Sequence, residues 1–350
     1  MTSTPNPFRV ALTGDFYDDD GKLKFDDIGL EILEGKSQIA VERFQHHQPE
    51  INSRQIGDSH GVIVLTPRVT GDSLQGCDNL LAIGRFGVGY DTVDVDACTE
   101  ADVLVMITSG AVDRPVAEAT VGWMIMLTHH MIAKDKMVRE ARWDDRVGYM
   151  GCELRDRTLG VIGLGGIGRS LVQLLAGFGM NQPIAYDPGV SMNDMEDVGV
   201  RKVELDELLS SADFVSIHCP LNESTRGLIS ARQLSKMKKD AYLINTARGG
   251  IVDEDALYDA LSSRMIAGAA LDCFQDEPLT QPHRLGELEN VVFAPHSIAW
   301  TNELFRDIGR TACQSMLDLS LGNRPSGIVN PELLERKSFQ EKWQRVLTDH

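Results

Sequence analysis

The stretch LGVIGLGGIGRS, residues 159–170, decides the fold of this chain. An apolar run ends in Gly163, Gly165 and Gly168, which have the spacing G-x-G-x-x-G, and a helix-like pattern follows at once. The first glycine allows a tight turn off a strand, the second lets the backbone approach a pyrophosphate, and the third lets the next helix pack closely on the sheet. The N–H groups at the start of that helix can bind anionic phosphates.

A carboxylate follows this motif at an informative distance. Asp187 comes directly after the apolar segment 183–186, nineteen residues past Gly168 (187 − 168). An acid at the end of this strand can accept hydrogen bonds from the ribose hydroxyls of adenosine, and it would repel the extra phosphate of NADP. The sequence therefore predicts a dinucleotide-binding unit that favours NAD. The alternative is a glycine-rich turn beside an unrelated surface acid.

Length and charge narrow the class of protein. With 350 residues, the chain is expected to form two domains, and 42% hydrophobic residues suffice for their cores. A formal net charge of -18 argues against non-specific binding to nucleic acid or to an anionic membrane. It does not exclude an anionic substrate, because a local arginine pocket can oppose the overall field.

Cysteines and apolar runs indicate a location inside the cell. None of the six cysteines has C-x-x-C spacing, so buried free thiols in a reducing compartment are expected. No secretory signal and no apolar run near the ~20 residues of a membrane span is evident, so we expect a cytoplasmic protein. The nine histidines lack metal-ligand spacing, and no metal is expected.

Short apolar segments alternate with helical patterns along the whole chain, which predicts an α/β fold with two doubly wound parallel sheets of the Rossmann type. The expected strands are residues 9–13, 61–66, 80–83, 103–107, 159–162, 183–186, 214–218, 241–245, 267–271 and 291–294. The expected helices are residues 25–33, 116–143, 170–176, 206–209, 230–237, 253–262 and 301–321.

Three residues with catalytic potential follow expected strands, where a doubly wound fold places its chemistry. Arg248 can hold a substrate carboxylate in a fork and polarise the adjacent carbonyl. His296 can exchange a proton with the substrate oxygen as hydride reaches or leaves carbon. Glu277 can bond the far ring nitrogen and keep the imidazole protonated to higher pH. Taken singly, each could instead be a surface ion pair, a solvated acid or a turn residue.

In this order, these residues resemble the D-isomer-specific 2-hydroxyacid dehydrogenase family, over roughly residues 60–335. The matching segments are RFGVGYD (85–91), VAE (116–118), the glycine loop, HCPL (218–221), NTARGG (245–250), DCF (272–274) with EP (277–278), and APH (294–296).

The resemblance implies a site. Arg248, Glu277 and His296 would be catalytic. Cofactor-binding residues would be Gly163, Gly165, Gly166, Ile167, Gly168, Asp187, Cys219, Pro220, Thr225, Ala247, Arg248, Asp272 and His296. Substrate-binding residues would be Arg85, Val88, Gly89, Arg248 and Trp300, with no metal ligand.

The family also implies a discontinuous, flavodoxin-like substrate-binding domain of residues 1–115 and 302–350, and an NAD-binding domain of residues 116–301. Family members are usually homodimers built on their NAD-binding domains. The sequence stops soon after Pro331, so no C-terminal regulatory domain is expected.

Departures from the family pattern leave the substrate open. Trp300 would place a large ring near the substrate, and Arg85 or Arg114 could bind a second anionic group or form structural ion pairs. The main hypothesis is an NAD-dependent oxidoreductase that acts on a small (R)-2-hydroxy acid or its 2-keto acid. The alternatives are a short phosphoglycerate dehydrogenase and an NAD(H)-sensing binding protein of the corepressor type.

Overall fold

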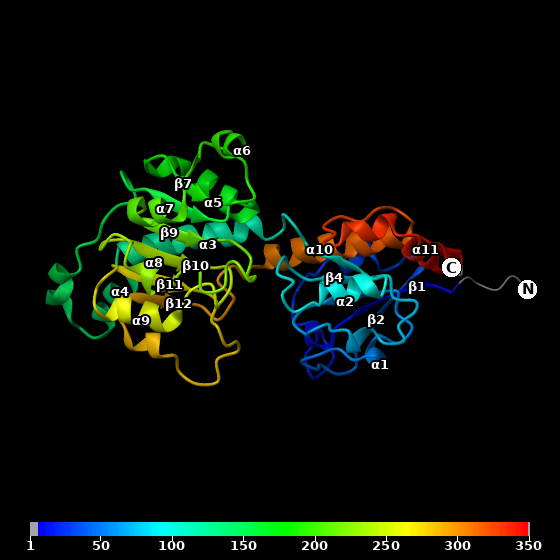
Figure 1. The fold of residues 1–350 in the computed structure, drawn as a ribbon. Coiled ribbons are helices and arrows are strands. Elements are labelled where there is room, and N and C mark those ends of the chain that lie inside the picture. Colours follow the sequence, from blue (N-terminus) through cyan, green and yellow to red (C-terminus); the bar gives the residue numbers. More distant parts are fainter. Residues whose placement is uncertain (1–5, 349–350) are drawn as a thin grey trace, which may run out of the picture. The chain divides into compact units, whose positions relative to one another are not determined.

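The computed structural model describes residues 6–348, which form two compact α/β units (Figure 1). The first unit runs to Val112 and resumes at Trp300, and the second extends from Asp113 to Ala299. Each unit contains one fully parallel sheet with helices packed on it. The predicted fold class, with two doubly wound sheets and one discontinuous unit, is confirmed.

The sheet of the first unit has five strands in the order β2-β1-β3-β4-β5, which is the flavodoxin-like order. The strands are β2 (Ile39–Arg43), β1 (Phe8–Leu12), β3 (Gly61–Val64), β4 (Ala82–Arg85) and β5 (Leu104–Met106). The α-helices are α1 (Ser53–Ile56), α2 (Val95–Glu100), α10 (Asn302–Ser320) and α11 (Lys337–Thr348).

Helix α10 completes the core of the first unit although it lies far along the chain. Met316 is fully buried and packs over two strands. A Cβ on Gly61 of β3 would lie 2.5 Å from its sulfur, and one on Gly84 of β4 would lie 2.8 Å from its methyl carbon. These glycines therefore create the space that the methionine fills.

The C-terminal segment is tied to strand β5 by a buried amide. Asn330 is 1% exposed, and its oxygen accepts the backbone N–H of Val105 at 2.9 Å. Its amide nitrogen donates to the carbonyl of Val103 at 3.0 Å and to the hydroxyl of Thr99 at 2.9 Å. One side chain thus supplies three hydrogen bonds, two to the backbone in and next to β5 and one to helix α2.

The sheet of the second unit has seven strands in the order β12-β11-β10-β9-β6-β7-β8. They are β12 (Val291–Phe293), β11 (Gly268–Leu271), β10 (Tyr242–Asn245), β9 (Phe214–Ile217), β6 (Leu159–Ile162), β7 (Ile184–Tyr186) and β8 (Arg201–Lys202). The α-helices are α3 (Asp113–Thr128), α4 (Met131–Arg139), α5 (Gly166–Leu175), α6 (Met192–Glu196), α7 (Leu205–Ser211), α8 (Ala231–Leu234) and α9 (Glu254–Ser262).

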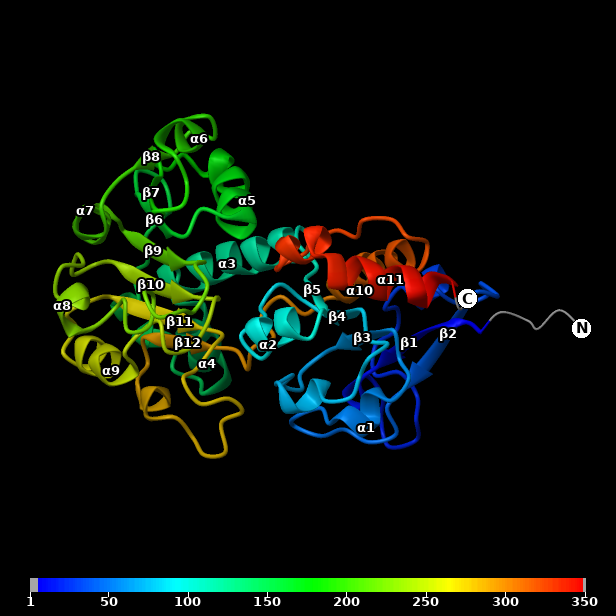
Figure 2. The same cartoon turned by 45° about the vertical axis from the view of Figure 1, so that its right-hand side comes forward.

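Helices cover both faces of this sheet, as Figure 2 shows. One core contains Val161 of β6 with residues of α3 and α5, and the other contains Ile162 with residues of α7, α8 and α9. Neighbouring residues of a strand point to opposite faces, so a strand buried on both sides is apolar throughout. This explains why the central strands appear in the sequence as unbroken apolar runs.

The predicted single helix over residues 116–143 is wrong, because the structure has two helices there. α3 ends at Thr128 and α4 begins at Met131, with His130 between them at φ 51. The Thr128 carbonyl accepts the N–H of Cys152 at 3.0 Å, so the returning chain occupies a carbonyl that a continuous helix would use.

The predicted helix over residues 25–33 is also wrong. Only the 3₁₀ turn Leu30–Ile32 forms, after Gly29 at φ +71. The Asp27 carboxylate accepts the N–H of Gly29 at 2.8 Å, which is the local bond of an Asx turn. The Phe25 ring stacks on Phe305 of α10 with centroids 4.1 Å apart, so packing on α10 replaces helix formation.

Strands β2 and β8 and helices α1, α2, α6 and α11 were not predicted. Over residues 6–348, no helix combines the length and the hydropathy needed to cross a membrane.

Replacing Asn330 with Ala is expected to lower the free energy of unfolding of the first unit by roughly 2–4 kcal/mol, because Val105 N–H and the Val103 carbonyl lose their partner. Urea denaturation followed by tryptophan fluorescence measures this loss. The exposed Asn323, replaced with Ala, serves as the control and should change the midpoint little. Equal effects of the two changes would contradict the role of Asn330.

Candidate active site

The glycine loop after β6 lies against the neighbouring strand β9. Gly163 has φ +91, and a Cβ there would lie 2.6 Å from the backbone nitrogen of Cys219. A Cβ on Gly168 would lie 2.6 Å from the carbonyl oxygen of Gly163, which shows how closely α5 starts beside the strand. Gly165 has no atom within 4 Å of its Cβ position. The chain is therefore open where a pyrophosphate would approach the start of α5.

Asp187, at the end of β7, holds this loop in place. One carboxylate oxygen accepts the N–H of Leu164 at 2.8 Å, and the other accepts the N–H of Gly189 at 2.8 Å. Each oxygen has a further lone pair for a ribose hydroxyl. The glycine loop, the N-terminus of α5 and this carboxylate together fit a dinucleotide.

The segment after β9 lies on the other side of the glycine loop. Burial lowers the pKa of His218 to about 4, and its Nε2 lies 2.8 Å from the Ser216 hydroxyl. Burial, followed by the charge of Asp187, raises the pKa of the Cys219 thiol to about 11. Thr225 donates to the Pro220 carbonyl at 2.6 Å, which closes the loop between these two residues.

Arg248 is positioned by Asn245, the buried last residue of β10. The Asn245 amide donates to the Arg248 carbonyl at 2.8 Å and accepts the N–H of Ala247 at 3.1 Å. The Arg248 guanidinium donates to the Ala247 carbonyl at 2.7 Å. A Cβ on Gly249 would overlap the carbonyl of Phe274, so the loops after β10 and β11 are in backbone contact.

Asp272 positions the loop that carries His296. It is 5% exposed, and one carboxylate oxygen accepts the N–H groups of Ser297 and Ile298 at 2.8 and 3.1 Å. Its backbone carbonyl accepts the N–H of His296 at 2.8 Å. His296 has φ 51, a left-handed conformation that costs a non-glycine residue about 1–2 kcal/mol. The three bonds to Asp272 stabilise the loop in this conformation.

Glu277 bonds His296 directly. One carboxylate oxygen lies 2.7 Å from Nδ1 of His296, and the other accepts the N–H of Phe274 at 2.7 Å. Burial raises the pKa of Glu277, but the hydrogen bonds from His296 and Phe274 and the charges of His296 and Arg248 outweigh it, so the net pKa is lowered. The carboxylate is therefore ionised at neutral pH. The imidazole, 45% exposed, leaves Nε2 for another partner.

The second unit thus contains all thirteen candidate cofactor-binding residues and the three candidate catalytic ones. They follow the carboxyl ends of β6, β7, β9, β10, β11 and β12, which belong to one sheet.

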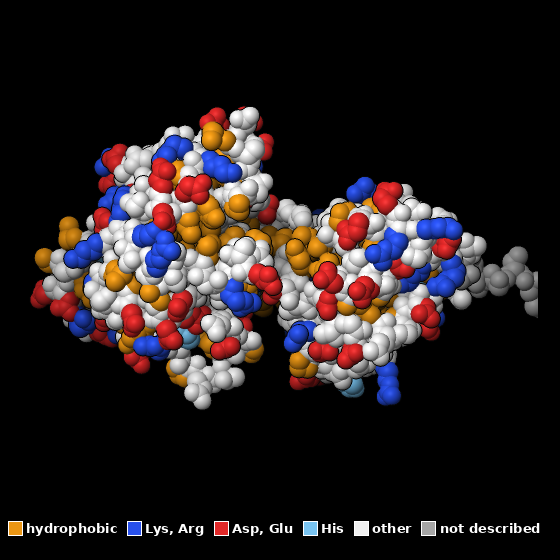
Figure 3. All heavy atoms as spheres, viewed as in Figure 1, with side chains coloured by type: hydrophobic (Ala, Val, Ile, Leu, Met, Phe, Trp, Pro, Cys, Tyr) orange, Lys and Arg blue, Asp and Glu red, His pale blue; other side chains and the backbone are white. Residues whose placement is uncertain are grey.

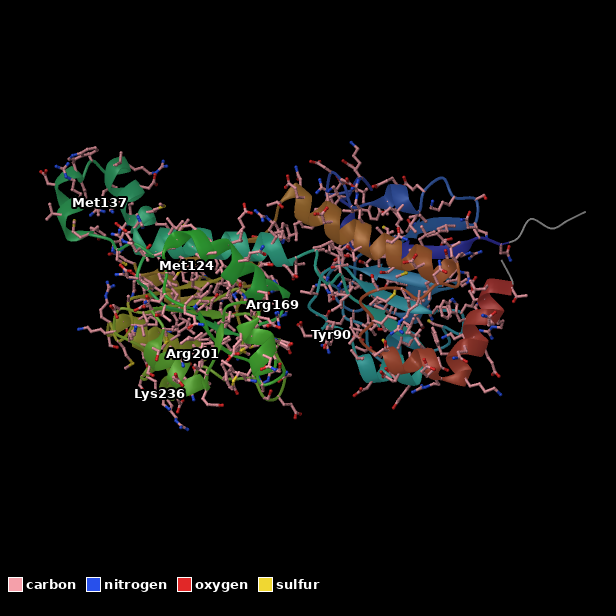
Figure 4. The ribbon with its side chains drawn as sticks, turned by 90° about the horizontal axis from the view of Figure 1, so that it is seen from above. Tyr90, Met124, Met137, Arg169, Arg201 and Lys236 are labelled. Carbon is pink, nitrogen blue, oxygen red and sulfur yellow. The ribbon has the colours of Figure 1, made fainter. Side chains whose placement is uncertain are left out.

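The remaining candidate substrate residues lie in the first unit. Arg85 ends β4, and its guanidinium donates to the carbonyls of Phe86 and Val64. Val88 and Gly89 follow in a half-buried loop that ends at the exposed Tyr90, which is labelled in Figure 4.

Trp300 belongs to an aromatic cluster of the first unit. It is 59% exposed, and its ring meets Phe305 edge-on at 5.1 Å between centroids. Phe305 also stacks near Phe86 at 6.1 Å, next to the Val88–Gly89 loop. Arg114, by contrast, is exposed on α3 of the second unit and pairs with Glu118 at 3.5 Å.

Comparisons with known proteins agree with this geometry. The family model for the D-isomer specific 2-hydroxyacid dehydrogenase, NAD binding domain, matches residues 121–297. A glyoxylate reductase of Thermofilum pendens is 35% identical over 321 residues, which cover 89% of this chain and 94% of that protein. The chain belongs to the D-isomer specific 2-hydroxyacid dehydrogenases. It is therefore an NAD-dependent oxidoreductase of this family, as the sequence predicts.

Two further members of this dehydrogenase family are similar to the chain to different extents. D-3-phosphoglycerate dehydrogenase of Methanocaldococcus jannaschii is 38% identical over 284 residues, but the match covers 81% of this chain and only 54% of that protein. The crystal structure of a glyoxylate reductase from Paecilomyes thermophila superimposes with a TM-score of 0.80 at 27% identity, covering 94% of this chain and all of that one.

The structure also adds a residue that the sequence did not reveal. The Asp113 carboxylate, in the first turn of α3, lies so close to Gly166 that a Cβ there would overlap it. α3 and α5 pack side by side in the second unit, where Figure 4 labels Met124 and Arg169 on them. Burial raises the pKa of Asp113. An anion thus faces the helix N-terminus that would bind the pyrophosphate.

Replacing Asp113 with Asn is expected to tighten NADH binding about three- to tenfold at neutral pH, because one charge that repels the pyrophosphate is lost. In the unchanged protein, lowering the pH toward the raised pKa of Asp113 protonates the carboxyl and should lower the Kd for NADH. Asp113→Asn should remove this part of the pH dependence. Quenching of protein fluorescence by NADH measures the Kd.

The matched control for this prediction is Glu118→Gln, which removes one negative charge from the exposed face of the same helix. It should change the Kd less than twofold, as expected for a screened charge. An equal gain in both variants would assign the effect to net charge and would refute a local role of Asp113.

Proposed function

We propose that the chain reduces a small 2-keto acid to the (R)-2-hydroxy acid, with His296 as the proton donor, Glu277 as its partner and Arg248 as the carboxylate-binding residue. The observation that carries this proposal is the 2.7 Å bond between Glu277 and Nδ1 of His296, in a loop that adjoins the Arg248 loop. The reverse reaction uses the same groups, with His296 accepting the proton.

His296 and Glu277 divide the proton transfer between them. The ionised Glu277 fixes the ring orientation and stabilises the imidazolium, so Nε2 can donate its proton to the substrate carbonyl oxygen. The bound nicotinamide supplies the hydride that reaches C2. Arg248 binds the substrate carboxylate and polarises the neighbouring carbonyl. Asp272 acts as a positioning residue, because its carbonyl accepts the N–H of His296 and its carboxylate accepts the N–H groups of the next two residues.

We assign NAD binding and the three catalytic residues to the second unit, and we propose that the first unit supplies further contacts to the substrate. In the first unit, the backbone around Val88 and Gly89 would bind the substrate carboxylate, beside the rings of Phe86, Phe305 and Trp300. This division rests on the family resemblance and on the open glycine loop of the second unit.

We further propose a substrate without a second anionic group. The two arginines considered for such a group already have partners: Arg85 donates to the backbone carbonyls of Val64 and Phe86, and Arg114 pairs with Glu118. This favours glyoxylate or hydroxypyruvate over phosphohydroxypyruvate.

A homodimer in the cytoplasm completes the proposal, and an exposed apolar segment of the second unit supports the dimer. We call α4 and the 3₁₀ turn Trp143–Gly148, together with Met150, the dimer segment. This segment projects from the sheet, and Met137 on α4 is labelled in Figure 4. At the corresponding left edge of Figure 3, apolar side chains lie among charged ones. The exposed ones include Ile132 at 51%, Trp143 at 62%, Val147 at 76% and Met150 at 81%. A second copy would cover an area of this kind.

NADH oxidation followed against a panel of glyoxylate, hydroxypyruvate, pyruvate, 2-ketoglutarate and phosphohydroxypyruvate tests the reaction. Turnover is expected with glyoxylate and hydroxypyruvate, and His296→Ala should reduce kcat by about 10²–10⁴-fold, the usual contribution of a general acid. Glu277→Gln should also lower kcat, because His296 loses the carboxylate that orients its ring and stabilises the imidazolium.

Tight NADH binding without turnover on any acid would refute the proposal and favour a sensor. A clear preference for phosphohydroxypyruvate would refute the assignment of the substrate while leaving the reaction intact.

The double change Trp143→Asp and Val147→Asp is expected to convert the dimer to a monomer, because it places two charges in the apolar contact. Sedimentation velocity measures the mass in solution. Leu321→Asp, which places a charge at a 53% exposed leucine of the first unit, is the control and should leave the dimer unchanged. A dimer that survives the double change would place the interface elsewhere.

A further inference from the structure

Three side chains with different donor atoms converge beside the site. The sulfur of Cys273, a carboxylate oxygen of Glu277 and a ring nitrogen of His296 all lie within 4.8 Å of one another. All three belong to the second unit and follow strands β11 and β12, which are neighbours in the sheet. Two of them are the proposed proton donor and its partner, and the third has no part in the proposed reaction.

This set of donors is the one that zinc prefers. Zn²⁺ binds thiolate, imidazole and carboxylate ligands, with a tetrahedral arrangement and distances of about 2.0–2.3 Å. Those distances put neighbouring ligand atoms about 3.3–3.6 Å apart. Since the three atoms already lie within 4.8 Å, shifts of roughly 1 Å in side chains bring them to zinc distances. Mg²⁺ and Ca²⁺ prefer oxygen ligands only and do not fit.

We propose that Cys273, Glu277 and His296 form an inhibitory zinc site. As the Zn–S bond forms, Cys273 loses its proton to solvent; Glu277 already has the charged form that a metal requires, and His296 contributes a neutral nitrogen. No electron is transferred. A water molecule or the carboxylate of a keto acid completes the tetrahedron.

Zinc at this position stops catalysis through the groups that it occupies. Zinc bound to Nε2 occupies the nitrogen that carries the catalytic proton, and zinc bound to Nδ1 breaks the contact with Glu277. In both cases a carboxylate bound to zinc no longer stabilises the imidazolium. Cys273 also lies at hydrogen-bond distance from the Ala247 carbonyl, 3.3 Å from its sulfur, so zinc binding displaces a contact to the residue before Arg248. The inhibition, unlike the zinc binding itself, rests on the proposed function.

Access to the site differs among the three ligands. His296 and Glu277 are 45% and 32% exposed at their side chains, whereas Cys273 is 2% exposed. The metal would therefore meet the exposed pair first and the thiol last. The buried thiolate would then make the complex slow to dissociate, because a buried thiolate without its metal would be an unpaired charge.

The first experiment measures inhibition of keto-acid reduction by ZnCl₂ in a buffer without thiols or phosphate, with reversal by EDTA. Cys273→Val should retain basal turnover and raise the zinc concentration for half-inhibition at least about tenfold. Removal of even a residue that only contacts a metal ligand lowers metal affinity by about that factor. Cys152→Ala, at another cysteine of the second unit, is the matched control and should behave as the unchanged protein. Equal inhibition of all three proteins would overturn the proposal.

The second experiment does not depend on turnover. Titration with Co²⁺, a spectroscopic substitute for zinc, should give the near-ultraviolet charge-transfer band of a cobalt–thiolate bond in the unchanged protein and in Cys152→Ala. Cys273→Val and Cys273→Ser should both lack the band. Two different substitutions are used so that the misfolding of one variant does not decide the result. Absence of the band from the unchanged protein would overturn the site. If no protein turned over any acid, the proposed function would fail, and the cobalt band would still decide whether the site exists.

Discussion

The hydrogen bonds made by Asp272 connect the loops on which the site depends. Its backbone N–H binds the carbonyl of Asn245 at 3.0 Å, its own carbonyl binds His296, and its carboxylate binds the next two backbone N–H groups. Asn245 in turn holds the Arg248 loop. Two buried polar side chains therefore fix an arginine and a histidine that lie 48 residues apart (296 − 248). Burial makes each of these bonds expensive to leave unmade, which is why the arrangement is specific.

Much of the second unit could be predicted from its sequence. Its strands are buried on both faces and are therefore apolar, and each glycine of its loop is required for a different physical reason. Gly163 needs a positive φ and Gly168 needs contact with the strand, and both needs are visible in the spacing. The short strand β8, with exposed Arg201, has no apolar signal and was missed. The break between α3 and α4 was missed because it depends on Cys152, which returns from more than twenty residues away (152 − 128).

The site shows the same division between local and distant causes. Arg248, Glu277 and His296 could be picked out because each follows an apolar segment and carries a reactive group. Asp113 and Cys273 could not, since their positions depend on how α3 packs beside α5 and how the loop after β11 meets that after β10. No spacing in the sequence encodes such contacts. The family segment DCF (272–274) contains Cys273, but nothing in it indicates that the thiol lies next to the proposed proton donor.

The ties between Asn330, Met316 and the first sheet have a consequence for synthesis of the protein. The second unit is continuous, so it can fold as soon as its last strand has left the ribosome. The first unit cannot: β1 to β5 are made first, yet the helix that covers Gly61 and Gly84 is made almost last. During translation, the N-terminal strands therefore keep apolar surface exposed while the second unit is synthesised and folds. Chaperones should accordingly bind nascent chains mainly within these first hundred or so residues, and this binding should end when α10 emerges from the ribosome.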